Sequence, residues 1–165
     1  MTRVGFITSP LTSAHSVRGV GFYTKRLLEH LKPQAHGLNI EIIELNDQMV
    51  KWQNDKLDLV HYPYFDLFSH SLPILKNTKT VVTVHDVIPL EFPDHYPPGL
   101  HGWSNLQLQR LALSSVEGVI TDSYASVHSI RKYLQVPHEK IKLVYLAAGE
   151  KFKKVSKPRN IYKLP

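Results

Sequence analysis

The sequence predicts an α/β fold: a Rossmann-like, doubly wound parallel sheet with helices on both faces. Two observations support this. Short apolar runs, such as residues 4–8 and 80–84, alternate with segments whose apolar residues recur at helical spacing, such as 20–31. Strands separated by helices are joined by right-handed crossovers and therefore lie parallel in one sheet. The length of 165 residues suits about one domain.

The strand candidates are short, apolar and rich in β-branched residues, as is typical of strands that are buried on both faces of a sheet. The clearest is the run Thr-Val-Val-Thr-Val at residues 80–84, and Pro63 ends the third candidate. In chain order, we expect strands at residues 4–8, 39–45, 57–61, 80–84, 118–121 and 141–146.

Three longer helices are expected between these strands. An apolar stripe at helical spacing runs through residues 20–31 and ends before Pro33. Residues 103–116 are apolar on most sides, which predicts a buried helix. The third helix follows Ser123, whose hydroxyl can cap it. Residues 47–54 fit either a short helix or a turn.

The commonest strand order in such a sheet is 3-2-1-4-5-6. In that order the first and fourth strands are neighbours, and a crevice opens at their carboxyl ends. The loop at residues 9–21 and the connection that begins at His85 would line this crevice. The sequence therefore predicts one pocket that is formed by two loops far apart in the chain.

Composition argues against several classes of protein. The chain has no cysteine, which removes disulfides and thiolate metal sites and fits a cytoplasmic location. No apolar run reaches the ~18 residues of a membrane helix, and the first residues do not form a signal peptide. The net charge of +6 is concentrated in part in residues 151–165, which have only two aromatic residues, Phe152 and Tyr162. That segment has the character of a linker, so we expect no nucleic-acid partner.

The motif Arg18-Gly19-Val20-Gly21 stands at the start of the first predicted helix. Glycines let backbone N–H groups approach a ligand closely, and a helix N-terminus favours an anion. A dinucleotide fingerprint would need a third glycine where Thr24 stands and a tighter turn after the strand, so we expect no nicotinamide or flavin cofactor. A flexible loop that enters a helix explains the two glycines equally well.

The clearest strand ends in Val84-His85-Asp86. Ligands meet parallel sheets at this edge, so His85 is a candidate to hydrogen-bond a substrate hydroxyl or to stabilise developing charge. Asp86 is a candidate to fix the His85 tautomer or to accept a hydrogen bond from a hydroxyl. In the alternative interpretation, Asp86 caps a turn and His85 is structural.

Two more candidates follow other strands. Tyr62 belongs to an aromatic segment at residues 61–66 that can stack on a ligand ring, although packing is the commoner role of such rings. Ser123 begins a helix where its hydroxyl either binds a ligand oxygen or, more simply, caps the helix. The ten histidines include no His-x-x-x-His pair on a helix, so we expect no metal site.

Several segments, which follow one another in the same order as in the family, resemble family 4 glycosyltransferases of the GT-B fold. The likeness extends from residue 3 to about residue 155. The strongest match is Val-Val-Thr-Val-His-Asp-Val-Ile-Pro-Leu-Glu-Phe-Pro at residues 81–93. The other matching segments are residues 4–7, 19–24, 58–63, 120–123 and 136–145.

The resemblance implies a retaining, hexosyltransferase-like enzyme that moves a sugar from a nucleotide-sugar to a sugar or lipid acceptor without an obligatory metal or other cofactor. Two Rossmann-like domains then face each other across a cleft, and the N-terminal one holds mainly the acceptor. By the same resemblance, Gly19 and Gly21 lie near the donor phosphates and the acceptor, and His85 lies beside the reacting sugar.

The resemblance also divides the chain. Residues 1–150 correspond to the acceptor-side domain, and residues 151–165 correspond to a basic linker toward a C-terminal donor-binding domain that this sequence lacks. The chain as given is therefore expected to be inactive alone. One departure is the segment Leu146-Ala-Ala-Gly-Glu150, where the family often has Asn-Gly-Val-Asp. The basic tail motivates an alternative: a stand-alone module that docks on a partner subunit or peripherally on an anionic membrane surface.

Overall fold

All six predicted strands are present in the computed structural model, which describes residues 1–46, 56–149 and 152. Their bounds are β1 (Thr2–Ile7), β2 (Ile40–Leu45), β3 (Leu59–Tyr62), β4 (Lys79–Thr83), β5 (Gly118–Thr121) and β6 (Ile141–Leu143). Neighbouring strands are parallel throughout. The predicted helix or turn at residues 47–54 lies outside the described residues, and so does the predicted linker except for Phe152.

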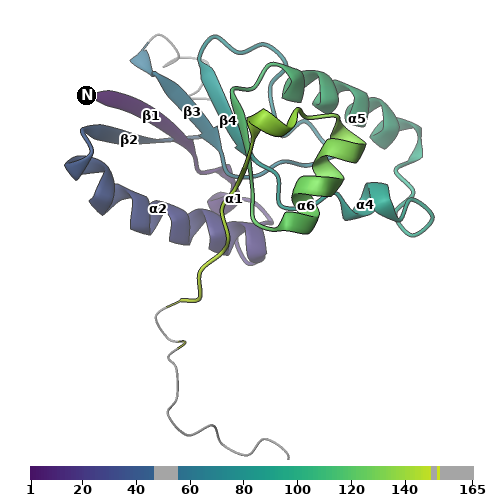
Figure 1. Ribbon diagram of the computed structural model, residues 1–165, viewed down its shortest axis with the longest axis horizontal. Helices are drawn as coiled ribbons and strands as arrows, with labels where there is room; N and C mark the ends of the chain where they lie inside the picture. The colour runs from purple at the N-terminus through teal and green to yellow at the C-terminus, as the bar shows by residue number, and fades with distance from the viewer. Residues whose placement is uncertain (47–55, 150–151, 153–165) are drawn as a thin grey trace, which may run out of the picture.

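The helical segments lie between the strands as expected for a doubly wound sheet. In Figure 1, α2 runs along one side of the sheet, and α5 and α6 lie together on the other. Their bounds, with the shorter turns, are α1 (Ser9–Thr12), α2 (Gly19–Gly37), α4 (Ile88–Glu91), α5 (Gly99–Ser114), α6 (Tyr124–Ser129), a π-helical turn η2 (Ile130–Leu134) and a 3-10 turn η3 (His138–Lys140).

The strand order is 2-1-3-4-5-6, so the predicted order 3-2-1-4-5-6 is wrong. β3 lies between β1 and β4, and β2 forms the edge. The physical reason is burial. In β3, the side chains of Val60 and Tyr62 are only 2% and 6% exposed, as in a strand with neighbours on both sides. β2 instead carries Glu41 and Glu44, which pair with Arg3 and Lys32 at the surface, and charged side chains are typical of edge strands.

Two helices differ from their predictions. α2 continues past Pro33 to Gly37, because the carbonyl that the proline leaves without a partner lies on an exposed turn. The predicted burial of the helix at residues 103–116 is right for Leu106, Ala112 and Leu113 but wrong for Trp103 and Leu111, which are 58% and 55% exposed. The buried face of α5 also includes two polar side chains, Asn105 and Gln109.

The observed order changes where the sheet can bind a ligand. α2 follows β1 and leads outward to β2 on one side, whereas the chain from β3 proceeds to β4 on the other. The two directions diverge between β1 and β3, and ligands bind at such switch points beyond the carboxyl ends of the strands. The loops after β1 and β3 therefore form the crevice, and His85 lies next to it at the end of β4.

Candidate active site at the carboxyl edge of the sheet

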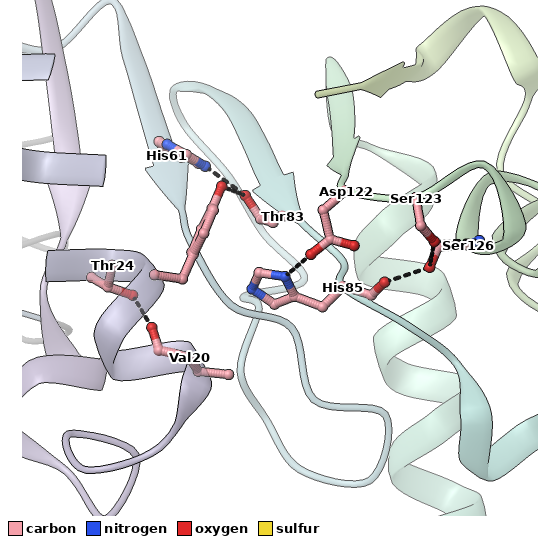
Figure 2. Close-up of polar contacts among 9 residues, drawn as sticks. Val20, Thr24, His61, Thr83, His85, Asp122, Ser123 and Ser126 are labelled. Carbon is pink, nitrogen blue, oxygen red and sulfur yellow. Dashed lines mark hydrogen bonds and ion pairs between the residues drawn. The ribbon is translucent and has the colours of Figure 1, made fainter. Parts of the chain in front are cut away.

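The site is centred on His85 and Asp122, each of which follows a strand. β4 and β5 are neighbours, with Thr83 opposite Ile120, so the residues just beyond their ends meet at the same edge. The Nδ1 atom of His85 lies 2.7 Å from Oδ2 of Asp122, and both side chains are about one-fifth exposed. Because a carboxylate can only accept, Nδ1 carries a proton and donates to Asp122. Figure 2 shows this pair with the imidazole between Asp122 and the first turn of α2.

The other side of the imidazole faces α2. The ring of Tyr23 packs edge-on against it, with centroids 4.6 Å apart and planes at 89°. The second nitrogen, Nε2 of His85, is buried and has no hydrogen-bond partner among the described residues. A buried polar atom without a partner costs about 1–3 kcal/mol. With Nδ1 donating to Asp122, Nε2 of the neutral imidazole is a hydrogen-bond acceptor without a partner among the described residues.

Tyr23 is itself held by a buried polar chain. Its hydroxyl lies 3.2 Å from Oγ1 of Thr83, and the same oxygen lies 2.9 Å from Nε2 of His61. Burial lowers the pKa of His61 to about 4, so this imidazole is neutral at pH 7. Burial also raises the pKa of Tyr23. The chain His61–Thr83–Tyr23 therefore carries no charge and fixes the ring against which His85 packs (Figure 2).

The two glycines of the first loop have different environments. A Cβ added at Gly21 would lie 2.4 Å from the carbonyl oxygen of His15 and 2.7 Å from two backbone atoms of Ser16. A Cβ at Gly19 would meet nothing within 4 Å. Gly21 therefore lets the loop pack on α2, whereas Gly19 leaves open space at a helix N-terminus that no side chain caps. Between them, Val20 accepts a hydrogen bond at its carbonyl from Thr24 Oγ1 at 2.8 Å.

Of the two interpretations of Asp86, the structure agrees with the turn cap and not with the partner of His85. Oδ1 of Asp86 accepts a hydrogen bond from the backbone N–H of Ile88 at 3.0 Å, so Asp86 caps the turn that begins α4. Asp122, which the sequence did not single out, is the partner of His85. Successive side chains of an extended segment point to opposite sides, so the residue next to His85 is poorly placed to reach it. The signal for Asp122 is its position just after β5, the neighbour of β4.

The other predicted residues are placed as follows. Ser123 is the N-cap of α6, where its hydroxyl accepts from Ser126 N–H at 3.0 Å, as the simpler interpretation predicted. Ser126 in turn donates to the carbonyl oxygen of His85 at 2.6 Å, so this helix start holds the His85 backbone. Tyr62 is buried at the end of β3 and lines a cavity whose other walls are residues 7–15 and 63–71.

These features define an α/β domain with a polar, partly buried pair at the carboxyl edge of a parallel sheet. The family model described as Glycosyltransferase Family 4 matches residues 42–147. That match spans more than half of the chain, and the chain belongs to this family, as its sequence motifs had indicated. A search of curated proteins found no match.

Two further findings concern the described part of the chain. No three His, Asp or Glu side chains gather there in an arrangement suited to a metal ion. No helix in the same residues combines the length and apolar character that are needed to cross a membrane.

Proposed function

We propose that this domain forms the acceptor side of a transferase that moves a sugar from a nucleotide-sugar to a hydroxyl of the acceptor with retention of configuration. Membership of the glycosyltransferase family supports the reaction class. The single observation that carries the site is the His85–Asp122 pair, with an unpartnered Nε2 at the carboxyl edge of the sheet. The donor nucleotide is held by a second domain, as in the enzymes that the sequence resembles, so this domain alone does not transfer sugar.

In the proposed reaction, the bond between the anomeric carbon of the donor sugar and the diphosphate oxygen breaks, and the nucleoside diphosphate leaves. A bond then forms from the acceptor oxygen to the same carbon, and the acceptor proton passes to the leaving phosphate. His85 accepts a hydrogen bond from a sugar hydroxyl at Nε2, which positions the ring. The carboxylate of Asp122, acting through the imidazole, stabilises the positive charge that develops on the sugar.

The test compares His85→Ala and Asp122→Asn in the protein as the gene encodes it. Release of nucleoside diphosphate is measured over a panel of nucleotide-sugars and acceptors, together with the melting temperature. We expect His85→Ala to lower kcat at least about 100-fold, the scale for loss of a group that stabilises transition-state charge. Asp122→Asn keeps the shape and an acceptor but removes the charge, and should cost at least about tenfold.

His36→Ala is the matched control, because His36 is an exposed histidine at the far end of α2. It should leave turnover unchanged. The proposal fails if His85→Ala loses activity only in proportion to a loss of melting temperature, or if its turnover equals that of the control. Absence of transfer from every nucleotide-sugar by the unaltered protein would also refute it.

A further inference from the structure

A cavity of about 200 Å³ opens at the switch point between β1 and β3. One wall comes from the end of β1 and the loop after it, within residues 7–15, and the other from the end of β3 and its loop, within residues 62–71. The cavity is thus located where a doubly wound sheet binds its ligand. It is separate from the His85–Asp122 pair, and nothing described so far occupies it.

The cavity is lined by rings and hydroxyls. The rings of His15 and Tyr64 face each other with centroids 4.5 Å apart, and Tyr62 adds a third ring. Ser13 contributes a hydroxyl that can donate to a ligand, whereas the Ser71 hydroxyl already donates to Gln109 and accepts from the N–H of Asp66. The ten lining residues include no Lys, Arg, Asp or Glu. Such a surface suits a neutral ligand with apolar faces and many hydroxyls, and it lacks a side chain of permanent charge to bind a phosphate.

The wall after β3 is held in place by buried polar side chains of α5. Gln109 bonds both the N–H and the carbonyl oxygen of Leu72 at 3.1 Å, and its Oε1 also accepts from the Ser71 hydroxyl at 3.1 Å. Asn105 donates to the carbonyl oxygen of Phe68 at 2.9 Å. These bonds explain why α5 buries two amides, and they make the wall a preformed surface. Ligand pockets are usually preformed in this way.

The opposite wall is fixed to α2. The carbonyl oxygen of His15 accepts from the N–H of Gly21 at 3.2 Å, and Gly21 leaves no room for a side chain between them. A ligand in the cavity therefore lies beside the α2 N-terminus.

We propose that this cavity binds one uncharged pyranose ring of the acceptor. This inference rests on the proposed function, which it extends by naming the chemical class of the acceptor group. The volume is below the ~300–1,000 Å³ of sites for drug-sized ligands, so it suits a single ring rather than an oligosaccharide. Side-chain hydroxyls, which both donate and accept, match sugar hydroxyls better than they match the fixed donor and acceptor pattern of a nucleobase.

The experiment is a titration of the ¹⁵N-labelled chain with methyl glucoside, methyl mannoside and methyl galactoside, followed by NMR. We expect at least one glycoside to bind with a Kd of about 1 mM, as a ligand of this size does. The largest shifts should fall within residues 9–15 and 62–71. Uridine and glucose 6-phosphate are titrated in the same way, as representatives of the two competing ligand classes, nucleosides and phosphorylated sugars.

Two variants locate the binding site. Ser13→Phe places a large ring in the cavity mouth and should weaken glycoside binding at least tenfold. Ser114→Phe makes the same change at the other end of the sheet, at the end of α5, and should bind like the unaltered chain. Dispersed NMR spectra of both variants verify that they fold, and His70→Ala removes a lining ring without filling the space, which should also weaken binding.

The inference is overturned if no glycoside produces saturable shifts at these residues, if Ser13→Phe binds as well as Ser114→Phe, or if uridine or the phosphorylated sugar binds the cavity more tightly than the glycosides. The proposed function is tested separately. Loss of transfer in His85→Ala without glycoside binding would leave the function and remove the cavity assignment. Glycoside binding together with undiminished transfer in His85→Ala would keep the cavity assignment and remove the role proposed for His85.

Discussion

Replacing each of the two glycines at the start of α2 by alanine should have opposite effects on stability. At Gly21 the new Cβ would lie 2.4 Å from the carbonyl oxygen of His15, so loop and helix must separate by roughly 1 Å to reach ordinary contact. The obstacle is backbone, which cannot rotate away as a side chain could. The shift also weakens the two hydrogen bonds that His15 accepts, from Gly21 N–H at 3.2 Å and Arg18 N–H at 2.9 Å.

The magnitude follows from opposing terms. Overpacking of this kind costs about 1–3 kcal/mol, and each weakened hydrogen bond costs about 0.5–1.5 kcal/mol. Alanine gains back about 0.5–1 kcal/mol relative to glycine in a helix. We expect Gly21→Ala to lower the free energy of unfolding by about 1–5 kcal/mol, which in a chain of this length lowers the melting temperature by roughly 2–20 °C. Gly19→Ala meets no atom and should be neutral or slightly stabilising.

Thermal and urea unfolding, followed by circular dichroism, measure both variants against the unaltered chain. Gly21→Ala should also weaken glycoside binding, because His15 lines the cavity. Gly19→Ala should leave that binding unchanged and affect only a ligand that approaches the α2 N-terminus. Equal stability of Gly21→Ala and the unaltered chain, or equal damage by the two substitutions, would refute this reasoning about the loop.

Two further predictions concern buried polar groups. The pKa of His61 falls from its ordinary 6.5 to about 4 in the folded chain. Between these two pH values the unfolded chain therefore binds more protons than the folded chain. The contribution of His61 to the free energy of unfolding is complete above pH 6.5 and should decline by about 3 kcal/mol as the pH falls to 4. His61→Gln should remove that dependence on pH in urea unfolding, and an unchanged slope would contradict the assignment. Gln109→Leu leaves the N–H of Leu72 unpaired in the core and should cost roughly 2–4 kcal/mol. The exposed control Gln34→Leu should stay within about 0.5 kcal/mol, and equal stability of the two variants would disprove the role of Gln109.

The fold class could be predicted because it depends on local patterns that the chain repeats. β4 and β5 are short β-branched runs between helical segments, and this alternation is sufficient to indicate a parallel sheet. The order of the strands could not be obtained in that way, because it depends on which strands lie inside the sheet and which lie at its edges. The glutamates of β2 were the available signal: charge at residues 41 and 44 marks an edge strand, which places β3 inside.

The helix α5 shows how composition can mislead about burial. Its leucines and Trp103 suggested a helix that is buried on most sides, yet Trp103 and Leu111 are more than half exposed while Gln109 is fully buried. The amide is buried because the loop after β3 has no secondary structure, and Leu72 needs a partner for both of its backbone groups. A requirement imposed by a loop far away in the chain leaves no trace in the local sequence of α5.

The candidate site was predictable in position but not in its pairing. A polar residue just after a central parallel strand lies at the ligand-binding edge, and His85 met that condition. The adjacent Asp86 was a candidate for its partner because adjacency in sequence is visible, whereas adjacency across strands requires the register. With Thr83 opposite Ile120, Asp122 reaches the same edge as His85.

The corrected strand order also determines where His85 lies relative to the cavity between β1 and β3. Had the first and fourth strands been neighbours, His85 would have lain in the crevice itself. In the observed sheet the switch point lies between β1 and β3, and β4 is the next strand along. With strands ~4.8 Å apart, the end of β4 is about 7 Å from the middle of the switch point. That separation is about the width of one sugar ring, so a ring in the cavity and a ring against His85 would lie in contact, with an acceptor hydroxyl between them. An acceptor whose reacting hydroxyl extends from its ring on a long arm would overshoot His85, and the proposed site should therefore favour hydroxyls attached directly to the bound ring.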